Sequence, residues 1–293
     1  MKVVVGDNMK VYCGIVTYNP KIDVLKENIK SVYDQVNKVI IVDNASSNLK
    51  MIIDEIVQHF DVILISNKEN LGIASALNQI VSVAIKDEID WVLTLDQDSL
   101  VPENYLISFT EYMSDNVGIL CPRIFDIERN VEDLPSKEAS LVVEVLKCIT
   151  SGSILNVDAW KTVKGFDEKL FIDGVDFDYC FRIRQAGYRI LKNQKITIQH
   201  SIGERRVIKI GKIKKIISSH SGFRLYYICR NKVYCDYKIR KYISLRSLFS
   251  IVKILCNIIL WEDNKSDKLK CSIKGIRDSF ELIKNYRADC EVY

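Results

Sequence analysis

The sequence predicts an α/β protein in which helices flank a mostly parallel sheet, with a helical extension at the C-terminal end. Two observations carry this prediction. Up to about residue 98, strand-like and helix-like segments alternate, an order typical of parallel sheets covered by helices. From about residue 204, apolar residues recur at a helical spacing instead. We therefore expect residues 1–203 to form one domain and residues 204–293 a helical, basic region.

The first half of the chain holds four strand-like segments rich in β-branched and aliphatic residues. In chain order they are VYCGIVTYN, KVIIVDN, DVILISN and WVLTLDQD. Helix-like segments at residues 22–35, 49–59 and 72–86 lie between them. Ligands of such sheets bind beyond the carboxyl ends of the strands. Four polar clusters end these strands and should line one edge: Thr17 to Asn19, Asp43 with Asn44, Asn67 to Asn70, and Asp96 to Asp98.

The alternation breaks down after residue 118. Strand candidates are GILCPRIFD, LVVEVLKCITSGSIL and YRILKNQKITIQH, and a helix is expected near Asp176 to Ala186. The last third holds the periodic runs HSGFRLYYICRNKVYCDY and ISLRSLFSIVKILCNIILW. Arg246 and Lys253 interrupt the second run, so we expect an interfacial or core-packing amphipathic helix rather than a membrane span.

Composition argues against several classes of protein. With 48% hydrophobic and 27% charged residues the chain is globular rather than disordered. Its nine cysteines are an odd number, scattered and without a C-x-x-C pair, which argues against a disulfide framework or a zinc knuckle. The N-terminal region lacks an apolar run of signal-peptide length. We therefore expect reduced thiols in a cytoplasmic protein.

Charge is distributed unevenly along the chain. Residues 205–246 hold thirteen Lys or Arg against the one acid Asp236, a net charge of +12. The remainder has 29 basic and 37 acidic residues, a net charge of −8. A basic segment on an acidic protein indicates an anionic partner, although a solvated helix face is the alternative. Because no base-reading motif is present, a phosphorylated ligand or an anionic lipid surface fits better than nucleic acid.

Two carboxylates, Asp96 and Asp98, follow the fourth strand with one residue between them. Neighbouring like charges at a buried strand end are costly unless a cation neutralises them. Carboxylate oxygens suit Mg²⁺ or Mn²⁺ bridging a diphosphate, and such an ion stabilises a departing nucleoside diphosphate. The alternative for a lone D-x-D is a helix-capping turn.

These clusters, taken in order, resemble the nucleotide-sugar-binding signature of family two inverting glycosyltransferases, whose fold is the Rossmann-like GT-A fold. The resemblance spans roughly residues 10–240. The motifs that carry it are VTYN, IVDNAS, NKENLGIASALN, LTLDQDS, CITSGSILNVDAWKTVKGFDEKLFIDGVDFDYCFRIRQAGYRI, HSIG and FRLYYICRN. LDQDS in particular is similar to the form seen in rhamnosyltransferases of bacterial surface polysaccharide assembly.

The resemblance implies a donor-binding role for the strand ends. Asp43 would accept a hydrogen bond from the imide N–H of a uracil or thymine ring. Asn70 and Gly72 would present the following helix N-terminus to the donor, unless Gly72 only makes a turn. Ser151 and Gly152 would form the floor of the sugar pocket, with a strand-edge bulge as the alternative. The implied substrate-binding residues are Thr17, Tyr18, Asn19, Asp43, Asn70, Gly72, Asp96, Gln97, Ser151 and Gly152.

A metal site is implied as well. Asp98 would be a direct ligand of a divalent cation, and Asp96 would contact the ribose or the water shell of the metal. His200 matches the position of a third metal contact, although a lone histidine is more often structural. The expected cofactor is therefore Mg²⁺ or Mn²⁺.

Asp176 would be the general base of the implied reaction. The family has an acid before this residue, whereas this chain has Val175, so Asp173 and Asp178 remain possible substitutes. Acids that complement a helix dipole are the alternative interpretation of Asp176 and Asp178.

The resemblance implies inverting transfer of L-rhamnose from dTDP-β-L-rhamnose to a saccharide, linked to polyprenyl diphosphate, in cell-surface polysaccharide synthesis. A UDP-hexose donor and a non-catalytic nucleotide-sugar-binding protein are the alternatives. The basic, apolar C-terminal region would hold the enzyme peripherally at the inner face of an anionic cell membrane. Homodimerisation through the same helix is the competing explanation.

Overall fold

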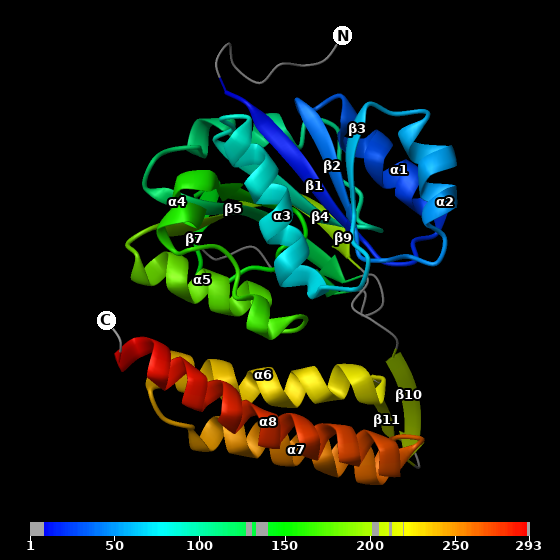
Figure 1. The fold of residues 1–293 in the computed structure, drawn as a ribbon, viewed down its shortest axis with the longest axis vertical. Helices are drawn as coiled ribbons and strands as arrows, with labels where there is room; N and C mark the ends of the chain where they lie inside the picture. Colours follow the sequence, from blue (N-terminus) through cyan, green and yellow to red (C-terminus); the bar gives the residue numbers. More distant parts are fainter. Residues whose placement is uncertain are drawn as a thin grey trace. The chain divides into compact units, whose positions relative to one another are not determined.

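The computed structural model describes the chain as two compact units (Figure 1). The described residues are 9–126, 131–132, 140–200, 205–210, 213–218 and 220–291. The first unit comprises Met1–Glu168 and Asp176–Ser201, and the second comprises Lys169–Val175 and Ile202–Tyr293. The chain thus enters the second unit briefly at Lys169–Val175 and returns before its C-terminal part. Nothing in the sequence pattern indicated this excursion.

The first unit is built on one mixed sheet. In the part of the chain that the structure describes, the strand order is β3-β2-β1-β4-β8-β5-β9-β7, with β6 paired to β5. Strands β1 to β4 are parallel to one another, whereas β8 runs antiparallel to both β4 and β5. The strands are β1 Val11–Thr17, β2 Lys38–Asp43, β3 Val62–Ser66, β4 Trp91–Asp96, β5 Val117–Asp126, β6 Val131–Glu132, β7 Val142–Glu144, β8 Ser153–Asn156 and β9 Arg189–His200.

Helices follow the strands in the expected order. They are α1 Ile22–Tyr33, α2 Leu49–Ile52, α3 Gly72–Lys86, α4 Val157–Thr162 and α5 Val175–Gln185. The segment predicted as a helix at 49–59 begins as α2 and continues as one π-helical stretch, η1 Ile53–Val57. There are also two 3₁₀ stretches: η2 Leu106–Tyr112 lies in the first unit, and η3 Glu168–Leu170 begins at its last residue before the second unit. The predicted fold class is confirmed.

Helices cover both faces of the parallel strands. Cys13 and Ile15 of β1 pack in the core cluster that includes Leu25 and Ile29 of α1. Successive strand residues point to opposite faces, and Gly14 between them lies against α3. A Cβ at Gly14 would collide with the side chain of Ile80, so the missing side chain lets α3 lie close to the sheet. The helices thus bury both faces of these strands.

The second unit combines a hairpin with three helices. Strands β10 Arg205–Ile210 and β11 Ile213–Ser218 pair in antiparallel register, followed by α6 Gly222–Arg240, α7 Leu245–Trp261 and α8 Lys265–Glu291. The expectation of a wholly helical region from residue 204 is therefore wrong for the hairpin. Its sequence intersperses Ile and Val among Arg and Lys, a composition that suits strands better than helices. No described helix has the length and apolar character needed to cross a membrane.

Helix α6 packs mainly along α8 in this unit. The two helices approach each other closely at Gly275, where a Cβ would collide with the backbone of Tyr226, and the Tyr226 hydroxyl donates to Asp278 Oδ2 at 3.0 Å. Helix α7 packs less extensively on this pair. All eight cysteines whose side chains the structure describes are free thiols.

Candidate active site

The strand ends of the parallel part of the sheet meet at one edge. Thr17 of β1 lies opposite Asp43 of β2, and Asp43 lies opposite Ser66 of β3. On the other side of β1, Val16 lies opposite Asp96 of β4. The polar clusters that end these four strands are therefore neighbours, as the sequence predicted.

Asp43 holds the ends of β1 and β2 together. Its side chain is fully buried and accepts hydrogen bonds from the Thr17 hydroxyl at 2.9 Å, from the Ser46 amide at 2.9 Å and from the Ser46 hydroxyl. A buried carboxylate needs such donors to offset the loss of water. The structure thus gives Asp43 and Thr17 a role in shaping this edge, and their contact with the nucleotide stays a prediction.

The loop after β1 is fixed from two sides. Asn19 has a φ of 49°, in the left-handed region that asparagine tolerates better than most residues. Its side-chain oxygen accepts from the Ser47 amide at 2.8 Å. The amide of Tyr18 donates to Oε1 of Gln97 at 2.9 Å, while the Tyr18 side chain is exposed. Gln97, predicted to bind substrate, therefore connects the first and fourth strand ends.

The turn into α3 depends on a glycine. Gly72 has a φ of 83°, a conformation that a residue with a side chain rarely adopts. Its amide donates to Asn70 Oδ1 at 2.9 Å, and its carbonyl accepts from Asn44 Nδ2 at 3.1 Å. Asn70 and Gly72 thus form the turn that opens α3, and their proposed contact with the donor stays a prediction.

Asp96 to Ser99 form a tight turn beyond β4, closed by a 3.2 Å hydrogen bond from the Ser99 amide to the Asp96 carbonyl. Asp96 is half-buried and Asp98 is exposed. The buried Ser151 hydroxyl accepts from the Asp96 amide at 3.1 Å and lies 2.7 Å from the Ser99 hydroxyl. Ser151 therefore lies beneath the turn that presents the two carboxylates.

Gly152, next to Ser151, is buried and has a φ of 78°. A Cβ there would lie 2.5 Å from Cδ1 of Ile198. Its carbonyl accepts a hydrogen bond from the hydroxyl of Tyr105, whose pKa burial raises well above the usual value, so this hydroxyl remains a donor. The glycine thus permits close packing beneath the Asp96–Ser99 turn.

Asn28 of α1 is a functional candidate that the sequence reasoning missed. Its side chain is fully buried, and its Nδ2 donates to the carbonyls of Asp96 at 2.7 Å and of Ser99 at 2.6 Å. One amide therefore holds both ends of the Asp96–Ser99 turn. A signal was present, because Asn28 interrupts the buried apolar stripe of α1 between Leu25 and Ile29.

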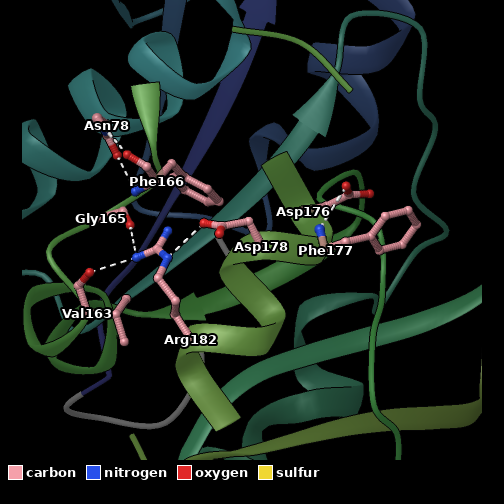
Figure 2. A network of polar contacts seen from close by, with 8 residues as sticks. All are labelled: Asn78, Val163, Gly165, Phe166, Asp176, Phe177, Asp178 and Arg182. Atoms are coloured by element: carbon pink, nitrogen blue, oxygen red, sulfur yellow. Dashed lines mark hydrogen bonds and ion pairs between the residues drawn. The ribbon is translucent and has the colours of Figure 1, made fainter. Parts of the chain in front are cut away.

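Three acids lie at the start of α5 or just before it. Asp178 is fully buried and accepts from Arg182 Nε at 2.7 Å, and Asp173 accepts from both Nε and Nη2 of Arg224 at 3.2 and 3.1 Å. Asp176 is half-buried, and its Oδ1 accepts from the Phe177 amide at 2.9 Å. Figure 2 shows Asp176 pointing away from the Asp178–Arg182 pair. Arginine therefore pairs with both suggested substitutes.

The segment before η3 is held by the same arginine and by α3. Arg182 Nη1 donates to the carbonyls of Val163 at 2.7 Å and Gly165 at 2.6 Å (Figure 2). Asn78 of α3 accepts from the Phe166 amide at 2.8 Å and donates to the Phe166 carbonyl at 3.0 Å. These contacts connect the helix that carries Asp176 to the helix behind the donor edge.

His200 ends β9, and its side chain lies outside the described residues. Its backbone lies opposite Asp126 in register, and the preceding residue, Gln199, forms an isolated antiparallel bridge with Leu100. Leu100 is two residues beyond Asp98, so the chain brings the His200 backbone toward the Asp96–Ser99 turn. The expected metal contact of His200 stays a prediction.

The carboxylates of Asp96 and Asp98 fit a hard divalent cation. Both come from one short turn, supply only oxygen ligands, and one of them is exposed. Mg²⁺ is typically bound by one or two carboxylates together with substrate phosphates. Among the described side chains no group of three or more His, Cys, Asp or Glu is gathered as a metal site.

Known proteins resemble this chain in sequence. The sequence profile of glycosyl transferase family 2 matches residues 12–189. The chain is 29% identical over 292 residues to the dTDP-rhamnosyl transferase RfbF of Shigella flexneri, a match that covers 92% of this chain and 96% of that protein.

Solved structures share the fold. S. aureus TarS 1–349 in complex with UDP-GlcNAc matches with a TM-score of 0.61 and 16% identity, over 92% of this chain and 80% of TarS 1–349. GalNAc-T7 with UDP, GalNAc and Mn²⁺ matches with a TM-score of 0.60 and 14% identity, over 96% of this chain. This chain spans 57% of the GalNAc-T7 chain. Because the profile covers more than half of its length, the chain belongs to glycosyl transferase family 2.

Proposed function

We propose that this glycosyltransferase moves L-rhamnose from dTDP-β-L-rhamnose to a saccharide acceptor, with inversion at the anomeric carbon. The observation that carries the proposal is the match to a dTDP-rhamnosyl transferase, which extends over nearly the full length of both chains. A UDP-hexose is the second candidate donor, because TarS 1–349, which shares the fold, was solved with UDP-GlcNAc. The proposal concerns the donor and acceptor, since family membership already establishes a glycosyltransferase.

On the donor side, the aligned strand ends form the proposed nucleotide site. Thr17 to Asn19 and Asp43 would contact the base and ribose, and Asn70 with Gly72 would face the phosphates or sugar. The hydrogen bonds among these residues fix the loops before substrate arrives, which lowers the ordering cost of binding.

Asp96 and Asp98 would hold the divalent cation, with His200 as a third contact. When bound, such an ion neutralises the charge that develops on the departing diphosphate. The role of this chain is to hold the two carboxylates in place through Asn28 and Ser151.

Asp176 is the proposed general base. It takes the proton of the acceptor hydroxyl as that oxygen bonds to the anomeric carbon, while the bond from this carbon to the diphosphate oxygen breaks and the nucleoside diphosphate leaves from the opposite face. Asp176 is half-buried and so open to an acceptor, whereas Asp178 is fully buried, which supports this assignment over Asp178. A positioned base contributes ~10²- to 10⁴-fold in rate.

A donor panel tests the function. Purified protein is incubated with dTDP-rhamnose, UDP-glucose or UDP-GlcNAc, with and without Mn²⁺, and thermal stabilisation and slow donor hydrolysis are measured. We expect the largest response to dTDP-rhamnose with Mn²⁺. A response confined to a UDP-sugar would show that this UDP-sugar, and not dTDP-rhamnose, is the donor.

Variants then test the assigned residues. Asp176→Asn should lower kcat by ~10²- to 10⁴-fold with the donor-induced thermal shift retained, and Asp98→Ala should remove the Mn²⁺-dependent part of that shift. Asp158→Asn, at an exposed helix start, is the matched control and should behave as wild type. Full transfer by Asp176→Asn would refute the base assignment.

The acceptor is proposed to be lipid-linked, and α7 offers a surface for a membrane. Its exposed apolar residues, called here the α7 face, are Leu245, Leu248, Phe249, Val252, Ile259 and Leu260. At 3.6 residues per turn they form one stripe, and the exposed cations Arg246 and Lys253 fall along one border of it. From Leu245 to Trp261 the helix contains no acid.

This charge pattern favours an anionic membrane as the occupant of the α7 face. Each Lys or Arg near such a surface contributes ~1 kcal/mol of attraction, and the apolar stripe suits the headgroup boundary. A second copy would instead bring uncompensated cations together. The proposed location is therefore peripheral, at the inner face of the cell membrane.

Vesicle flotation tests this part of the proposal. Wild type should float with vesicles containing phosphatidylglycerol and stay behind with pure phosphatidylcholine. Phe249→Asp should abolish flotation, whereas Ile273→Asp, at an exposed apolar residue of α8, should not. Suppose instead that the wild type floats with neither kind of vesicle and sediments as a dimer, and that Phe249→Asp dissociates this dimer. That result would show that a second copy of the chain occupies the α7 face.

A further inference from the structure

The short segment Lys169–Val175 contains backbone conformations that are unfavourable without supporting contacts. Phe171 and Asp173 have φ angles of 63°, and Gly174 has 85°. A left-handed conformation is unfavourable for a residue with a side chain, because its Cβ approaches the following carbonyl oxygen too closely. Two such residues within one short segment persist only where surrounding contacts determine them.

Asn231 of α6 supplies the central contact. Its side chain is buried, and its Nδ2 lies 2.7 Å from the carbonyl oxygens of Leu170 and Ile172 and 2.8 Å from that of Asp173. One amide group thus gathers three carbonyls of a single turn. Without it, these carbonyls would lose a buried donor, and any carbonyl left unpaired would destabilise the turn.

Other residues of α6 hold the same segment. Arg224 forms the bidentate pair with Asp173, and Arg230 donates to the carbonyls of Lys169 and Leu170. Tyr227 stacks on the ring of Phe171, with centroids 4.7 Å apart and planes within 13°. The motif FRLYYICRN, for which the sequence offered no chemical role, therefore supplies the contacts that shape Lys169–Val175.

The segment leads directly into the proposed base. Val175 begins α5, and the next residue is Asp176, where the chain returns to the first unit. The backbone passes from Gly174, in its left-handed conformation, straight into the first turn of α5, which carries Asp176.

We propose that Asn231 is a positioning residue for Asp176: through the turn at Leu170–Asp173 it shapes the backbone that leads directly into the start of α5. This inference rests on the proposed role of Asp176 as general base. It assigns Asn231 a function in the chemical step.

The test uses full-length protein and Asn231→Leu, which keeps side-chain volume and removes the donor. We expect kcat for transfer to fall ~10- to 100-fold, by analogy with residues that orient the ligands of a metal ion through hydrogen bonds. The KM for the donor should stay within about twofold of wild type. The acidic limb of the kcat–pH profile, which reports the base, should also move. If Asn231 served folding alone, the variant would keep the wild-type acidic limb of the kcat–pH profile and the wild-type kcat per folded molecule.

Controls separate the possible outcomes. Asn257→Ala, at a half-buried asparagine of α7, should leave kcat unchanged. If Asn231→Leu does not fold, the half-exposed ion pair between Arg224 and Asp173 is tested by the same criteria. Arg224→Gln should lower kcat and shift the acidic limb of the kcat–pH profile, and Arg224→Lys should restore part of the activity.

The inference and the proposed function fail in different ways. Wild-type kcat and pH profile in folded Asn231→Leu, with Asp176→Asn inactive, would overturn the positioning role alone. An active Asp176→Asn would overturn the base assignment and with it the inference.

Discussion

Replacing Asn28 by leucine is the most direct perturbation of the Asp96–Ser99 turn. The change keeps the volume of a fully buried side chain and removes both hydrogen bonds that the amide donates. The Asp96 carbonyl keeps its bond from the Ser99 amide, whereas the Ser99 carbonyl loses its partner at 2.6 Å. The two carbonyls are therefore affected to different extents.

The magnitude follows from these contacts. An unpaired buried carbonyl costs ~1–3 kcal/mol, and a lost hydrogen bond with the acceptor still paired costs ~0.5–1.5 kcal/mol. Asn28 Oδ1 is itself buried without a hydrogen bond among the described residues, so its removal returns part of this cost. The net destabilisation should be about 1–3 kcal/mol, or a decrease of about 3–9 °C in Tm for a unit of this size.

The functional consequence is larger than the loss of stability. Residues that orient metal-binding carboxylates typically change metal affinity or activity by ~10- to 100-fold. Titration of Mn²⁺ in the transfer assay, below the Tm of the variant, should show that increase in the required Mn²⁺ concentration. Ser31→Ala is the matched control on the same helix, because the Ser31 hydroxyl accepts from the Val101 amide at 3.3 Å, outside the turn. Asn28→Leu with wild-type Mn²⁺ dependence would refute the reasoning.

Three further predictions concern stability. Gly152→Ala should cost about 2–4 kcal/mol in urea unfolding, because the alanine meets both a left-handed backbone and a close neighbour; an unchanged midpoint would contradict this. Asp178→Asn should lower the free energy of unfolding by about 3–5 kcal/mol, since Arg182 is left without its buried partner. A loss no larger than that of the exposed control Asp158→Asn would disprove it. Burial and nearby Arg224 lower the pKa of His220 below 6.5, so the folded state binds fewer protons and stability should fall as pH drops below about 6.5. His220→Asn should flatten this dependence in Tm measured from pH 7.5 to 5, and an equal slope in both proteins would refute it. The charged groups that act on His220 are Arg224, Asp173, Glu262 and Lys268.

Chain order and periodicity were sufficient for the donor side of the site. Near-continuous apolar strands separated by helical segments require parallel strands, and parallel strands bring their carboxyl ends to one edge. The sequence therefore predicts that Thr17, Asp43 and Asp96 lie together, and the observed register agrees. It does not predict the hairpin at Arg205–Ser218, because interspersed Ile, Val and Lys also fit a helical pattern.

Fold class, the edge at which the polar clusters meet and the family of the chain can all be predicted from the amino-acid sequence. Those properties depend on local periodicity and on the order of segments. Tertiary packing, in contrast, decides that Asp173 and Asp178 pair with arginines and which buried amides hold the loops of the site. Asn28 reaches residues 68 and 71 positions away, and Asn231 reaches residues 58 to 61 positions away. A hydrogen bond over such a separation leaves no periodic trace, because it depends on how two distant backbone segments pack.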